Sequence, residues 1–65
     1  MNQMQRDKRA IRTVLEQVGP ASFSEIALRA GEGLYPAMRE MIDDGEVTCE
    51  TVGDKLVYSL PKEEI

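Results

Sequence analysis

Residues 33–47 read GLYPAMREMIDDGEV, and this stretch decides the predicted fold. Four of its apolar residues recur at the spacing that places side chains on one face of a helix: Leu34, Met38, Met41 and Ile42. Pro36 suits the first turn of a helix, where its missing N–H has no partner to lose, and Gly45 suits the left-handed residue after a helix. The stretch therefore predicts a helix over about residues 34–44 that leads directly into a strand.

A first helix is predicted over residues 4–18. Its apolar face repeats at the same helical spacing, with the side chains of Ile11, Val14, Leu15 and Val18. Gly19 and Pro20 end this helix, because glycine accepts the left-handed cap conformation and proline cannot continue a helix. Residues 1–3 before it are expected to be frayed, as are residues 61–65 at the other end of the chain.

The start of the second helix has two interpretations. Ser24 is the preferred N-cap, because this choice leaves Phe23 before the helix, where it can pack on Leu28 as a hydrophobic staple. The alternative is Ser22, which is followed three residues later by the glutamate of a capping box. Under both interpretations the helix has about two turns, and a short first strand is expected before it, near residues 21–23.

An alternating pattern follows residue 45 and predicts two antiparallel strands. The residues expected to face inward are Val47, Cys49, Thr51, Leu56, Tyr58 and Leu60. Gly53 and Asp54 suit a two-residue turn with glycine at its first position. This turn pairs each inward residue with another, for example Cys49 with Tyr58, as a one-sided sheet requires. Cys49, the single cysteine, is accordingly interpreted as a small buried side chain.

The composition limits the classes of function. The 65 residues correspond to one domain, and a hydrophobic content of 42% is that of a globular protein. With no histidine and one cysteine, a Cys/His metal site is excluded. No nucleophile–base pair or phosphate-binding loop is present, so no catalytic residue and no cofactor is expected. No apolar run approaches the ~18 residues of a membrane span, and no signal peptide is present, so we expect a cytoplasmic protein without membrane contact.

The order of helix, short extended segment, helix, turn, helix and hairpin resembles the winged helix-turn-helix superfamily, an α+β fold. Three groups of residues carry the resemblance: FSEIA at 23–27, the apolar residues Leu34, Met38 and Met41, and DDGEV at 43–47. The layout, which covers about residues 5–60, is similar to that of very small bacterial and phage regulators, including FeoC-like and PapI-like proteins. FeoC-like proteins usually carry several wing cysteines for an iron–sulfur cluster, whereas Cys49 stands alone, so no cluster is expected.

The resemblance implies a small transcriptional regulator whose third helix enters the major groove of double-stranded DNA. The candidates for base contacts are the outward residues of that helix, namely Tyr35, Pro36, Arg39 and Glu40. Arg39 suits a guanine edge or a phosphate, whereas Glu32 and Glu40 are expected to be repelled by the DNA backbone unless one of them accepts from the amino group of cytosine. The candidates for contacts with the phosphates that flank the groove are cations outside this helix: Arg6, Lys8, Arg9, Arg12, Arg29 and Lys55.

The charge favours a second class of function. The net charge is −4, which is the wrong sign for a typical nucleic-acid binder, although residues 1–15 carry four cations against one acid. With so few cations, a specific DNA binder of this size is expected to form a homodimer or to act with a larger partner. The alternative is a winged-helix docking module that binds a protein and makes no direct DNA contact. A third helix sharing its face with Arg6, Arg9 and Arg12 would favour DNA, whereas a neutral or acidic face would favour docking.

Overall fold

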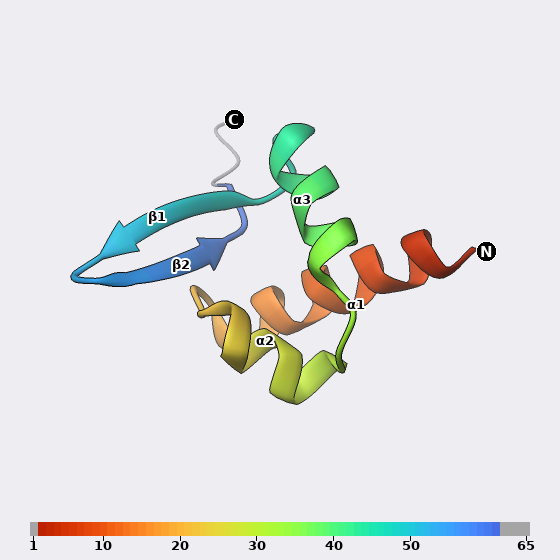
Figure 1. Ribbon diagram of the computed structural model, residues 1–65, viewed down its shortest axis with the longest axis horizontal. Helices are drawn as coiled ribbons and strands as arrows, with labels where there is room; N and C mark the ends of the chain where they lie inside the picture. Colours follow the sequence, from red (N-terminus) through yellow and green to blue (C-terminus); the bar gives the residue numbers. More distant parts are fainter. Residues whose placement is uncertain (1, 62–65) are drawn as a thin grey trace.

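Three helices and a two-stranded hairpin make up the computed structural model, which describes residues 2–61 (Figure 1). The helices are α1 (Gln3–Val18), α2 (Phe23–Ala30) and α3 (Tyr35–Asp43), and the strands are β1 (Thr48–Val52) and β2 (Lys55–Ser59). This is the predicted α+β order of elements, and the layout is that of a winged helix. Within residues 2–61, no helix is long and apolar enough to cross a membrane.

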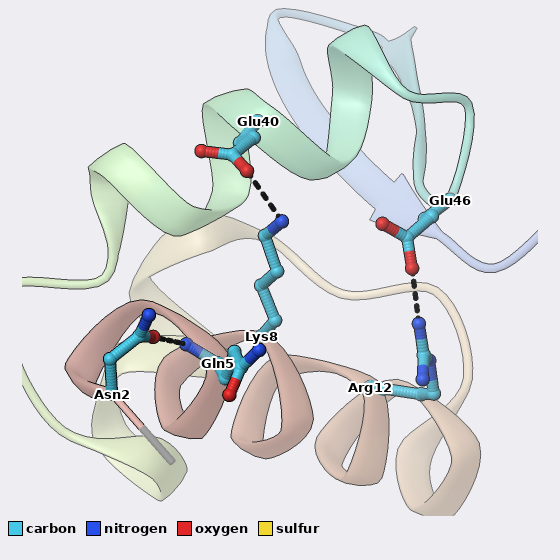
Figure 2. Close-up of polar contacts among 6 residues, drawn as sticks. All are labelled: Asn2, Gln5, Lys8, Arg12, Glu40 and Glu46. Atoms are coloured by element: carbon cyan, nitrogen blue, oxygen red, sulfur yellow. Dashed lines mark hydrogen bonds and ion pairs between the residues drawn. The ribbon is translucent and has the colours of Figure 1, made fainter.

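The N-terminus of α1 is capped, which the sequence analysis did not predict. The side chain of Asn2 accepts a hydrogen bond from the backbone N–H of Gln5 at 2.8 Å, so Gln3 already belongs to the helix (Figure 2). This cap satisfies a backbone donor that would otherwise be left unpaired. The predicted fraying is therefore wrong for residues 2 and 3, while residues 1 and 62–65 lie outside the described part of the chain.

The N-cap of α2 is Ser22. Its Oγ accepts a hydrogen bond from the N–H of Glu25 at 3.3 Å, and the helix begins at Phe23. The preferred choice of Ser24 as the cap is thus wrong, and Ser24 lies exposed in the first turn. The alternative cap is confirmed.

The predicted staple between Phe23 and Leu28 is also wrong, because the side chain of Leu28 is 83% exposed. Phe23 instead contacts two aromatic rings edge-on, with its centroid 6.0 Å from that of Tyr35 and 6.2 Å from that of Tyr58. These three rings join the start of α2, the start of α3 and β2. Each such edge-to-face pair stabilises a fold by about 0.5–1.5 kcal/mol in addition to the effect of burying apolar surface. A contact with an exposed leucine would not provide this stabilisation.

The C-terminus of α3 forms a Schellman motif. Gly45 adopts a left-handed conformation with φ 79°, and its N–H donates to the carbonyl of Ile42 at 3.1 Å. The N–H of Glu46 donates to the carbonyl of Met41 at 2.8 Å, which completes the motif. The helix is one residue shorter at each end than predicted, and the motif turns the chain from α3 into the hairpin.

The hairpin has the predicted register. Cys49 lies opposite Tyr58 and Thr51 lies opposite Leu56, as expected for a two-residue turn. Gly53 occupies the first position of this turn with φ 67°, a conformation that favours glycine. The turn chemistry and the alternating pattern therefore specified the same pairing.

The strand predicted near residues 21–23 is reduced to a single bridge. Ala21 and Tyr58 exchange two backbone hydrogen bonds, of 3.0 Å and 2.8 Å. Phe23 belongs to α2, so the extended segment ends before it. The bridge fastens the connection between α1 and α2 to β2.

Only the base of the hairpin is buried. Val47 and Tyr58 are 1% and 6% exposed, whereas Cys49, Thr51 and Leu56 are exposed. The hairpin extends beyond the helices, so its distal half has no element beneath it (Figure 1). The predicted burial of Cys49 is also wrong: it lies opposite the buried Tyr58, but Ala21 and α2 lie beside β2, and β1 is the outer strand.

The hydrophobic core lies between the three helices and the base of the hairpin. Its members are the side chains least exposed to solvent: Ile11, Val14, Leu15, Ala21, Ile26, Leu34, Ala37, Met38, Met41, Val47 and Tyr58. The predicted apolar face of α3 is confirmed, with Ile42 at its partly buried edge. This face fixes the rotation of α3, and therefore which of its side chains point outward.

Candidate nucleic-acid interface

The outward face of α3 carries the four side chains predicted to contact bases. Tyr35, Pro36, Arg39 and Glu40 are all exposed. They are exposed because the opposite side of the helix is held in the core. Tyr35 is 56% exposed, yet its ring rests against Phe23, so α2 supports it from below. The four side chains thus face solvent, and their role in DNA binding stays a prediction.

Glu40 turns toward α1. Its Oε1 lies 2.7 Å from the Nζ of Lys8, and the pair bridges α1 and α3 (Figure 2). The hydrogen bond that the Lys8 ammonium donates to Glu40 raises the pKa of Lys8 above its ordinary value. Glu40, a candidate for a base contact, is thus paired with Lys8, a candidate for a phosphate contact.

A second ion pair joins the same two regions of the chain. The guanidinium of Arg12 contacts the carboxylate of Glu46, one helical turn further along α1 (Figure 2). Both pairs are partly exposed, so they contribute little to folding stability. Their main effect is electrostatic, because they cancel two positive and two negative charges along one flank of α3.

The remaining predicted phosphate contacts lie elsewhere. Arg6, Arg9 and Arg29 line an open groove between α1 and α2, with a volume of about 670 Å³. Lys55 begins β2 beside the hairpin turn. Arg6 and Arg9 therefore do not share the outward face of α3 and Arg12 is paired with Glu46, an arrangement that favours docking by the criterion given above. The roles of these cations in DNA binding stay predictions.

Exposed apolar side chains form a feature that the sequence analysis missed. Leu28 was expected to pack on Phe23 and Leu56 to face inward, but they are 83% and 54% exposed. Leu56 borders a cleft of about 500 Å³ between the hairpin and the start of α2, which Phe23 also lines. The alternation of apolar and polar residues along the strands predicted that Leu56 faces inward. This pattern does not indicate how far the hairpin extends beyond the helices.

No metal site is found among residues 2–61, which contain no suitable group of three His, Cys, Asp or Glu side chains. Cys49 is exposed and forms no disulfide. Comparison of the chain with protein-family models, curated proteins and solved structures finds no match. The geometry of the side chains is therefore the basis for assigning a function.

Proposed function

We propose that this chain is a small winged-helix transcriptional regulator that binds double-stranded DNA through α3. One observation carries the proposal. Arg39 stands exposed on the outward face of α3, and it pairs with no acidic side chain of residues 2–61. The cations Lys8 and Arg12, in contrast, are held by carboxylates. Arg39 is therefore available to form the bidentate contact with guanine that arginine makes most often in the major groove.

The charges around α3 support entry of its N-terminal half into the groove. The carboxylate of Glu40 is compensated by Lys8, which reduces its repulsion of the DNA backbone. The acidic residues Asp43 and Asp44 lie at the opposite end of the helix, while Glu32 is exposed in the turn before it. The N-terminal end of a helix also carries a partial positive charge, which attracts phosphate. Recognition helices use their N-terminal residues for base contacts. The charges along α3 favour the same end of the helix.

The hairpin supplies one further cation to the proposed interface. Lys55 is exposed beside the turn, on the part of the hairpin that extends beyond the helices (Figure 1). Arg39 and Lys55 alone give few phosphate contacts, and such contacts supply most of the sequence-independent affinity for DNA, so a single copy of the chain is expected to bind weakly at physiological salt. We therefore propose that the regulator binds as a homodimer or together with a larger partner.

The test uses fluorescence anisotropy with a duplex that the protein itself has selected from a random pool, measured over a salt series. Arg39→Ala is expected to weaken binding to the selected duplex by about 1–3 kcal/mol and to weaken binding to random duplex less. Lys55→Ala is the matched control, because it removes one exposed cation and is expected to weaken both duplexes alike. Failure to bind any duplex at low salt, where counterion release helps most, would exclude the proposal for the isolated chain.

A second function, a protein-docking module without direct DNA contact, is favoured by the apolar side chains. Leu28, Tyr35 and Leu56 are each more than half exposed, and aromatic and apolar side chains dominate the centres of protein interfaces. The neutralised flank of α3 also fits a protein better than a phosphate backbone. In this case Tyr35→Ser abolishes capture of a partner from a cell extract, while Arg39→Ala has little effect. Loss of selected-duplex binding in Arg39→Ala would instead favour DNA.

A further inference from the structure

We propose that the groove between α1 and α2 binds an acidic peptide segment of a partner protein, one whose carboxylates flank an apolar side chain. This groove lies apart from the outward face of α3, so the inference goes beyond the proposed function. Its charged members are Arg6, Arg9 and Arg29. Its least exposed members are the apolar residues Ala10, Val14 and Ala30.

The groove is a cationic site on an acidic protein. Three of the eight Lys and Arg residues line it, and no Asp or Glu does, although the net charge is −4. Within residues 2–61, Arg6 and Arg9 form no ion pair, while Arg29 reaches Glu25 only at 3.8 Å. The groove thus keeps its charge, whereas Lys8 and Arg12 are neutralised. A surface of one sign attracts a partner of the opposite sign.

The burial pattern distinguishes a peptide from a nucleic acid. Val14 is 6% exposed and Ala10 and Ala30 are half-buried, whereas the three arginines are exposed, so apolar side chains form the floor and cations the rim. An apolar side chain gains free energy by covering such a floor, and a phosphate backbone does not. The volume of about 670 Å³ accommodates several side chains of a peptide.

The positions of the groove residues on α1 separate this site from α3. Arg6, Ala10, Thr13 and Gln17 follow each other at spacings of three and four residues, so they form one face of the helix. Lys8 and Arg12 contact residues of α3 and of the loop that follows it, and Arg9 lies between the two faces, because it also borders the cleft lined by Lys8, Arg12 and Glu46. A peptide in the groove therefore leaves α3 free, and DNA and peptide are expected to bind together.

The test measures binding of a fluorescein-labelled helical peptide with glutamates flanking leucines at helical spacing, and of a scrambled peptide of equal composition. The double variant Arg6→Gln/Arg9→Gln is expected to lower affinity for the patterned peptide at least about tenfold. The matched control is Arg39→Gln/Lys55→Gln, which removes the same charge from the other faces and is expected to change affinity less than about twofold. Circular dichroism confirms that each variant is folded.

A further variant keeps every arginine. Ala10→Glu places a carboxylate inside the groove, and we expect it to abolish binding of the patterned peptide. Three results would overturn the inference: equal losses in the two double variants, equal binding of the scrambled peptide, or displacement of the patterned peptide by unlabelled duplex. The first two would show non-specific attraction between charges, and the third would make the groove a nucleic-acid site. None of them bears on whether Arg39 reads DNA, so the two proposals fail separately.

Discussion

Lys8 and Glu40 lie 32 residues apart in the chain and join α1 to α3 through an ion pair of 2.7 Å. The pair decides the electrostatics of the candidate interface. It draws the exposed carboxylate of Glu40 toward α1 and uses a cation that was expected to contact phosphate. The exposed cation that remains on α3 is Arg39.

Breaking this pair from the acidic side is expected to strengthen DNA binding. Glu40→Gln removes one negative charge beside α3 and releases Lys8 for a phosphate. Anisotropy measurements over a salt series are expected to show higher affinity at low salt and a salt slope steeper by ~1. Glu50→Gln, on an exposed position of β1, is the control because it removes the same charge without releasing a cation. An equal slope change in both variants would show that only net charge matters.

The position of the α2 cap gives a prediction that is independent of function. Ser22→Ala removes the acceptor for the N–H of Glu25 and is expected to cost about 1 kcal/mol of the free energy of unfolding. Ser24→Ala removes a hydroxyl that caps nothing, and the expected change is within about 0.5 kcal/mol. Urea unfolding followed by circular dichroism measures both. A larger effect of the Ser24 variant would contradict the assigned cap.

Local patterns in the sequence account for most of the fold. The apolar stripe of α3 and the two-residue turn at Gly53 each involve neighbours in the chain, and both were predicted. The cap of α2 was not, because the staple expected between Phe23 and Leu28 was preferred over the capping-box pattern of Ser22 and Glu25. The ring of Phe23 instead contacts Tyr35 and Tyr58 far along the chain. Tertiary contacts of Phe23 thus replaced the local contact that favoured the wrong cap.

The electrostatics of the candidate interface depend on contacts that no local pattern contains. Lys8 meets Glu40, and Arg12 meets Glu46, across separations of 32 and 34 residues. The spacing of these residues in the sequence does not indicate that they form ion pairs. The exposure of Leu56 likewise depends on how far the hairpin extends beyond the helices, which alternation along a strand does not specify.

The core is expected to tolerate truncation poorly. Met38 is fully buried at the centre of α3, and Met38→Ala is expected to cost about 2–5 kcal/mol because it removes packed atoms and leaves a cavity. A small domain has little stability to lose, so this variant is expected to be largely unfolded at room temperature. Leu28→Ala, at a position that is 83% exposed, is the control and should melt close to the wild type. Similar melting temperatures for the two variants would contradict the assigned core.

Alkaline pH is expected to destabilise the fold through Tyr58. Burial raises the pKa of Tyr58 above its ordinary value of 10.0, because the phenolate is poorly solvated inside the protein. The pKa of Lys8 is also raised, from 10.5, by its hydrogen bond with Glu40. When the pKa is higher in the folded state, the stabilising contribution is complete below the unfolded value and is lost as pH rises through the folded value. The free energy of unfolding should therefore decrease above pH 10.0.

Tyr58→Phe isolates the contribution of the tyrosine. This variant has no phenol to ionise at the base of the hairpin, so its free energy of unfolding should decrease less steeply above pH 10.0 than that of the wild type. Urea unfolding at several pH values on both sides of 10.0 measures the two slopes. Tyr35→Phe is the matched control, since the ring of Tyr35 is 56% exposed and its hydroxyl is not enclosed by the core. A Tyr58 variant with the wild-type slope would contradict the assignment to Tyr58 and would leave Lys8, whose ion pair with Glu40 opens when the ammonium loses its proton, as the other group with a raised pKa.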